Sequence, residues 1–169
     1  GFINILGEKL EATKIGQRVS ELYIDPDAAF QLIRGLHKLV VGFDDFSLLH
    51  LVASNIEMSP WVNLLKRDYE WIEEDIDEVK DKIIVQIPKE WDWQYDEFLR
   101  SSKTAFLLRD WSEEFKEDYL LERYNVPPGA LRNKISTADW LLYGSSELSK
   151  LLGFMGKVNG INKVRLRVK

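Results

Sequence analysis

The residues best suited to chemistry are an aromatic, an arginine and several hydrogen-bonding side chains within residues 130–152, which have helical periodicity. Helical counting places Trp140 about 200° round this helix from Ala138 and Leu142, which belong to an apolar stripe. The side chains that share its side of the helix are Arg132, Asn133, Ser136 and Tyr143. An aromatic plane beside a guanidinium suits stacking on unpaired nucleic-acid bases, because every base has a π-face. A helix with neighbours on all sides would instead make Trp140 a core residue, and periodicity alone leaves both interpretations open.

The charge of the chain is unevenly distributed along the sequence. The net charge is -5, yet residues 125–169 hold eight Lys or Arg against only Asp139 and Glu147. This asymmetry indicates a C-terminal region that meets a polyanion, while the acidic remainder faces solvent or other domains. A chance accumulation of surface lysines is the alternative interpretation.

Catalytic and metal-binding motifs are not found. No Gly-rich loop is followed by Lys and Ser or Thr, so we expect no nucleotide cofactor in this chain and no catalytic residues. The sequence has no Cys, and its two histidines, His37 and His50, have no partner at ligand spacing. We therefore expect both histidines to be packed or surface residues, and we expect no metal site.

The elements that position the ridge on residues 130–152 are predicted to be mainly helical. Two short extended runs around Gly7 predict a β-hairpin near the N-terminus. Apolar residues at three- and four-residue intervals then predict helices over these segments: from Thr13, from Pro26 to about Val40, after Asp44, from Ser59-Pro60 to Ile83, about 94–114, about 116–124 and about 130–152. The predicted fold is mainly α, a multi-helix bundle with a small N-terminal hairpin.

Several stretches occur together and in order: residues 12–26, 49–54 with 58–60, 103–105 with 110–111, and above all 128–133 with 137–143. Together they resemble archaeal Hjm-type DNA helicases, a Ski-like branch of superfamily two that is similar to the helicase part of polymerase theta. The resemblance implies that residues 1–24 are the wing hairpin and last helix of a winged-helix domain. It implies that residues 25–169 form a helical ratchet domain, and that the motor domains lie outside this sequence.

In that family the long ratchet helix lies beside the translocating strand, where an aromatic and a polar or basic residue two turns earlier stack on bases. The resemblance carries these roles onto Trp140 and onto Arg132 or Asn133. It implies a single-stranded DNA-binding region of an ATP-dependent 3′-to-5′ helicase that acts on forked or branched DNA in replication and repair. The implied partners are this DNA and the motor domains, which would hold ATP and magnesium, and the implied location is the cytoplasm.

Two positions and the last segment of the chain depart from a simple match to the family. Ala130 stands where relatives often have a capping Asp, and Gly144 inside the long helix indicates close packing or a bend. Residues 164–169 alternate like a strand, whereas the resemblance implies a helix, which we adopt as the prediction.

Two other functions remain open at this level. One alternative to the DNA helicase is a protein-docking helical module of a Ski-like helicase. The other is part of an RNA helicase, because stacking does not report the 2′-hydroxyl. No run of eighteen apolar residues predicts a membrane span, so we expect a soluble protein.

Overall fold

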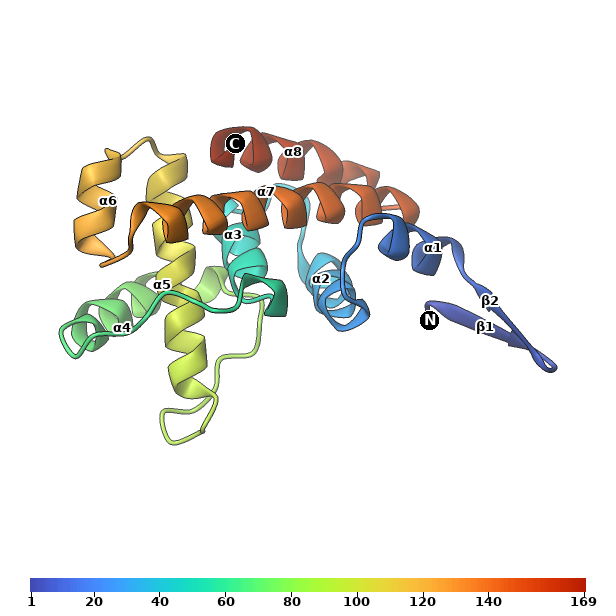
Figure 1. Cartoon of the computed structure of the whole chain (residues 1–169), viewed down its shortest axis with the longest axis horizontal. Coiled ribbons are helices and arrows are strands. Elements are labelled where there is room, and N and C mark those ends of the chain that lie inside the picture. The colour runs from blue at the N-terminus through green and yellow to red at the C-terminus, as the bar shows by residue number, and fades with distance from the viewer.

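The computed structural model describes residues 1–169 as eight α-helices and one antiparallel hairpin (Figure 1). The hairpin strands are β1 (Ile3–Leu6) and β2 (Lys9–Ala12). The helices are α1 (Lys14–Glu21), α2 (Pro26–Lys38), α3 (Asp45–Ala53), α4 (Asp68–Val79), α5 (Tyr95–Ser112), α6 (Glu117–Arg123), α7 (Pro128–Leu151) and α8 (Met155–Val168), with short 3-10 turns η1 (Ile56–Met58) and η2 (Lys80–Lys82). The predicted mainly α fold with a small hairpin is confirmed, and so is the helical prediction for the last residues.

Side-chain caps explain where the first helices begin. The Asp25 carboxylate accepts the backbone N–H of Asp27 at 2.8 Å, immediately before Pro26 in the first turn of α2. The Asp44 carboxylate accepts the N–H of Phe46 at 2.9 Å at the start of α3. These bonds satisfy N–H groups that have no partner inside the helix, so the chain enters the helices at these residues.

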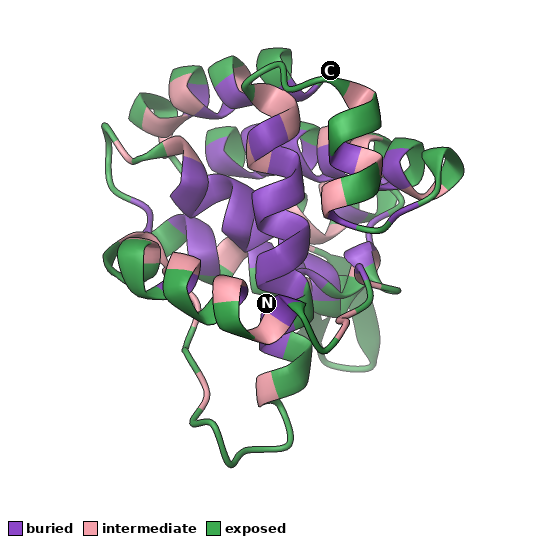
Figure 2. Cartoon of the chain, turned by 90° about the vertical axis from the view of Figure 1, so that its left-hand side faces the viewer, coloured by how far each residue is buried: buried purple, intermediate pink, exposed green.

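The longest helix, α7, is the spine of the bundle. Figure 1 shows α7 running along the molecule with α8 beside it, while α6 lies near one end and α1 near the other. The inner side of α7 packs on α2, α3 and α5, and the buried residues face this interior (Figure 2). The opposite side of α7 is left to the solvent and to the flanking helices α1 and α8. No helix of the chain is both long and apolar enough to cross a lipid bilayer.

The prediction that a helix begins at Ser59-Pro60 is wrong, because α4 begins only at Asp68. Partners elsewhere in the fold occupy the backbone groups of this stretch. The N–H of Val62 donates to a threonine hydroxyl on α5 at 3.2 Å, and the Lys103 ammonium donates to the carbonyl of Asn63 at 2.8 Å. These tertiary bonds replace the helical ones, so the apolar periodicity is misleading here.

Two polar contacts hold α3 and α4 against α5 inside the core. His50 Nε2 lies 3.0 Å from the hydroxyl of Ser102, and burial lowers the pKa of His50 to about 4. Lys103 and Asp68 form an ion pair at 2.7 Å in which both side chains are fully buried. Both histidines are packed or surface residues as predicted, since His37 is exposed and lies edge-on to Phe154.

Candidate nucleic-acid interface

The predicted ridge residues share the outward side of α7. Arg132, Asn133, Ser136 and Tyr143 are exposed, whereas Trp140 is half-buried. Neither Asn133 nor Ser136 makes a side-chain hydrogen bond within the chain, so their polar groups are available to a ligand. We call these five residues the α7 ridge.

Trp140 joins α7 to α1. Its indole Nε1–H donates to the backbone carbonyl of Leu22 at 2.9 Å, and its ring packs against the edge of the hydrophobic core. Leu22 caps the C-terminal end of α1, where carbonyl groups have no partner inside the helix. Trp140 is therefore neither a free surface ring nor a fully buried core residue, but a half-buried ring with a fixed edge.

Gly144 allows α7 to approach the connection between α1 and α2. A Cβ atom at this position would lie 2.6 Å from Cδ1 of Ile24, closer than real Cβ contacts allow. The helix itself continues without interruption through this position. Close packing, one of the two explanations offered by the sequence, is the reason for this glycine.

Tyr143 lies between two guanidinium groups from different helices. Its hydroxyl accepts from Arg18 of α1 at 3.3 Å, and the guanidinium of Arg165 of α8 lies 4.8 Å from the centre of its ring. Arg18 also contacts Glu147 at 3.2 Å, and Arg165 contacts Asp139 at 2.8 Å. The two acidic residues of the basic region therefore position these arginines beside the ridge.

Arg132 lies toward the other end of the ridge. Its side chain is 74% exposed and lies 3.6 Å from the carboxylate of Glu117. An exposed pair of this kind contributes little stability, about 0 to 1 kcal/mol. The guanidinium can consequently exchange this carboxylate for a phosphate at small cost.

The basic C-terminal region presents less positive charge than its composition indicates. The ammonium of Lys134 turns inward and donates to the carbonyls of Met58, at 2.7 Å, and Pro60, and burial lowers the pKa of Lys134. The ammonium of Lys157 donates to the carbonyl of Leu36 at 2.6 Å. Two of the eight basic residues thus stabilise the fold and are not presented toward a polyanion.

Sequence reasoning missed Arg18 and Arg165 as neighbours of the ridge. Arg18 precedes Tyr143 by 125 residues, and no local pattern links the two. Arg165 lies on α8, and the sequence does not reveal that α8 packs beside α7. A groove of about 330 Å³ beside Tyr143 is lined in part by Lys150, Arg165 and Lys169, which extends the basic surface beyond the ridge.

These features define a helical domain whose spine helix displays an aromatic and cationic surface between two flanking helices. Residues 46–169 match the family model described as archaeal helicase, domain 4, and the chain belongs to this family. The chain is 36% identical over 156 residues to the ATP-dependent DNA helicase Hel308 of Methanocella arvoryzae, an alignment that covers 90% of the chain and 21% of that protein. It is 34% identical over 186 residues to the Hel308 of Caldivirga maquilingensis, covering 100% of the chain and 23% of that protein. The chain thus spans about a fifth of the length of these relatives.

Proposed function

We propose that this chain is the single-stranded DNA-gripping region of an ATP-dependent 3′-to-5′ DNA helicase that acts on forked or branched DNA. Membership of the archaeal helicase domain 4 family supports a role in such an enzyme. The observation that carries the gripping role is the α7 ridge, which combines exposed hydrogen-bonding side chains with a half-buried indole. ATP and magnesium then bind to motor domains of the same enzyme, outside these residues.

The spacing of the ridge suits a single strand that runs along α7. Residues 132 and 140 are eight positions apart, which corresponds to about 12 Å along a helix. At roughly 3.4 Å per phosphate, the spacing of a base-stacked strand, this length covers about three nucleotides. Arg132 then meets a phosphate while Trp140 stacks on a base further along the strand.

The fixed edge of Trp140 supports a stacking role. A ring that is already held by a hydrogen bond loses little conformational entropy when a base stacks on it. The same bond connects the stacking position to α1. Movement of α1 relative to α7 therefore changes the orientation of the ring, which offers a physical link between the N-terminal part of the chain and the strand.

A titration with a labelled single-stranded oligonucleotide tests the proposal. We expect weak binding whose affinity falls as salt rises, because only a few phosphates are neutralised. The triple variant Arg132→Ala/Asn133→Ala/Ser136→Ala should weaken binding, whereas Lys66→Ala, which removes an exposed cation far along the chain from α7, should not.

The result also separates the other candidate functions. An affinity that does not respond to salt or to the triple variant would contradict the gripping role and favour protein docking. A matched RNA oligonucleotide that binds more tightly than DNA would contradict DNA as the substrate.

A further inference from the structure

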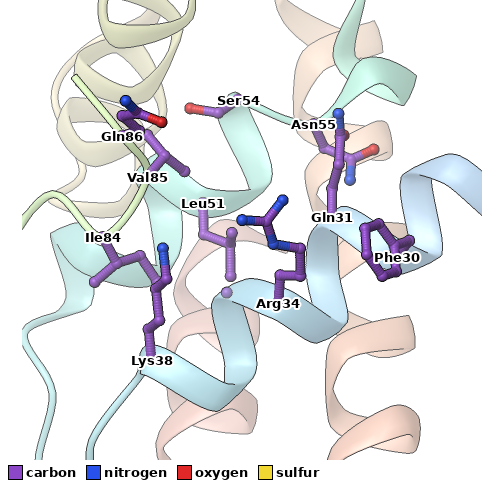
Figure 3. Close-up of a pocket in the computed structure, with 11 residues that line it drawn as sticks. Phe30, Gln31, Arg34, Lys38, Leu51, Ser54, Asn55, Ile84, Val85 and Gln86 are labelled. Atoms are coloured by element: carbon purple, nitrogen blue, oxygen red, sulfur yellow. The ribbon is translucent and has the colours of Figure 1, made fainter. Parts of the chain in front are cut away.

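A second surface feature lies away from the α7 ridge. A pocket of about 310 Å³ opens between α2, the C-terminal end of α3 and the segment that follows η2 (Figure 3). None of its lining residues belongs to α7 or α8. Its volume is at the small end of the range for ligand sites, about 300 to 1,000 Å³.

The pocket contains two unpaired positive charges. Arg34 and Lys38 are one turn apart on α2 and therefore neighbours on its surface. Both charged ends reach into the same space in Figure 3. Neither forms an ion pair or a side-chain hydrogen bond within the chain, and no Asp or Glu lines the pocket. In a chain of net charge -5, two adjacent cations without a carboxylate partner favour an anionic ligand.

The remaining walls offer neutral donors and an aromatic ring. The side-chain oxygen of Gln31 accepts the N–H of Ile56 at 3.1 Å, which leaves its NH2 group free to donate. Gln86 makes no hydrogen bond within the chain, and the backbone N–H groups of residues 84–86 donate none. The ring of Phe30 lies 5.8 Å from the Arg34 guanidinium. The pocket therefore combines free donors with an apolar and aromatic wall.

We propose that this pocket binds one nucleotide unit. The phosphate lies between Arg34 and Lys38, whose charged side chains can both bind it. The planar base lies along the apolar side chains of Leu51 and Ile84, and the amide of Gln86 hydrogen-bonds to its edge (Figure 3). The unit is either a free nucleotide or one residue of a nucleic-acid strand, since both present the same phosphate and base.

Isothermal titration of the chain with adenosine monophosphate, inorganic phosphate and a four-nucleotide single strand tests this site. The variant Arg34→Gln/Lys38→Gln removes both charges and should weaken binding at least about tenfold, because hydrogen bonds to charged groups are lost. The variant Lys9→Gln/Lys66→Gln makes the same change in net charge at exposed positions outside the pocket and should change affinity less than about twofold.

Gln86→Glu gives an independent measurement if the double variant folds poorly. It preserves the size of the side chain but introduces a negative charge into the pocket, so nucleotide affinity should fall about tenfold while the far-ultraviolet circular dichroism is unchanged. The triple variant Arg132→Ala/Asn133→Ala/Ser136→Ala, titrated with the four-nucleotide single strand beside the pocket variants, reports on the α7 ridge alone, since the pocket shares no residue with the ridge. Failure of the ridge proposal is thus measured separately.

The source of the nucleotide follows from which probe binds. Adenosine monophosphate binding that the pocket variants abolish supports a free nucleotide, whereas pocket-dependent binding of the strand alone supports a strand residue. Absence of binding for every probe, or an equal loss in Lys9→Gln/Lys66→Gln, would overturn the proposal. Equal affinity for inorganic phosphate and adenosine monophosphate would overturn the contact with the base.

Discussion

The indole N–H of Trp140 donates to the carbonyl of Leu22 at 2.9 Å, and this bond joins residues 118 positions apart in the chain. Trp111 makes the same kind of contact, with its Nε1–H donating to the carbonyl of Val168 at 2.8 Å. In both cases a half-buried tryptophan satisfies a carbonyl at the end of a helix. Only Trp140 belongs to the α7 ridge, so the two residues form a matched pair for experiment.

Two replacements of Trp140 should separate its contribution to DNA binding from its contribution to stability. Trp140→Ala removes a stacking ring and should cost about 1 to 3 kcal/mol of single-strand binding. Trp140→Phe retains a ring but loses the hydrogen bond to Leu22, so it should cost about 1 kcal/mol of stability. Its loss of single-strand binding energy should be smaller than that of Trp140→Ala. Oligonucleotide titration beside thermal melting measures both effects.

Trp111→Ala is the control for this experiment. It should lower the melting temperature as Trp140→Ala does, because each loses an indole and a bond to a helix end. Its DNA affinity, measured where the protein is folded, should equal that of the unaltered chain. Normal DNA affinity in folded Trp140→Ala protein would refute the stacking role and leave Trp140 as a packing residue only.

Gly16 allows the hairpin to lie against α1. A Cβ atom there would lie 2.1 Å from the carbonyl oxygen of Phe2. That oxygen is a backbone atom, so it cannot move aside as the end of a flexible side chain could. Gly16→Ala should therefore displace the hairpin and break the bond from the Thr13 N–H to the Phe2 carbonyl, now 2.9 Å. Faster amide exchange at Thr13 and faster proteolysis within residues 1–12 would show this. Gly129→Ala, where a Cβ meets nothing within 4 Å, should leave both rates unchanged.

His50 should make stability fall in mild acid. Burial lowers its pKa from 6.5 to about 4, so the folded state favours the neutral ring. The resulting stability is fully present above pH 6.5, and it is lost as the pH falls from there toward 4, by about 3 kcal/mol in total. Urea unfolding of the unaltered chain and of His50→Gln at several pH values across this range gives, for each protein, the slope of the unfolding free energy against pH. Equal slopes in the two proteins would contradict the prediction.

The buried pair of Lys103 and Asp68 should be sensitive to loss of one partner. Lys103→Met leaves the carboxylate buried without its cation and should cost about 3 to 5 kcal/mol of stability. Lys103→Met/Asp68→Asn removes the uncompensated charge and keeps an acceptor for the N–H of Leu65, so it should recover part of this loss. Lys80→Met, which breaks an exposed pair at 3.9 Å, should change stability by less than about 0.5 kcal/mol. Denaturant unfolding compares the three variants, and a similar cost for Lys103→Met and Lys80→Met would contradict the prediction.

The sequence by itself determined the helical class, most of the helix positions and the membership of the α7 ridge. Helical period decides which side chains share a side of residues 128–151, and this holds wherever the helix packs. Capping by Asp25 and Asp44 is also local, so the starts of α2 and α3 were predictable. Each of these features depends on residues a few positions apart.

Only the tertiary structure decided what surrounds that ridge. The partner of Trp140 lies on α1, the guanidinium groups beside Tyr143 come from α1 and α8, and the start of α4 depends on bonds to α5. Local periodicity contains no information about contacts between residues distant in the chain. Because a buried backbone group must find a partner somewhere, tertiary hydrogen bonds around residues 59–67 outweighed a helical pattern that the sequence displays.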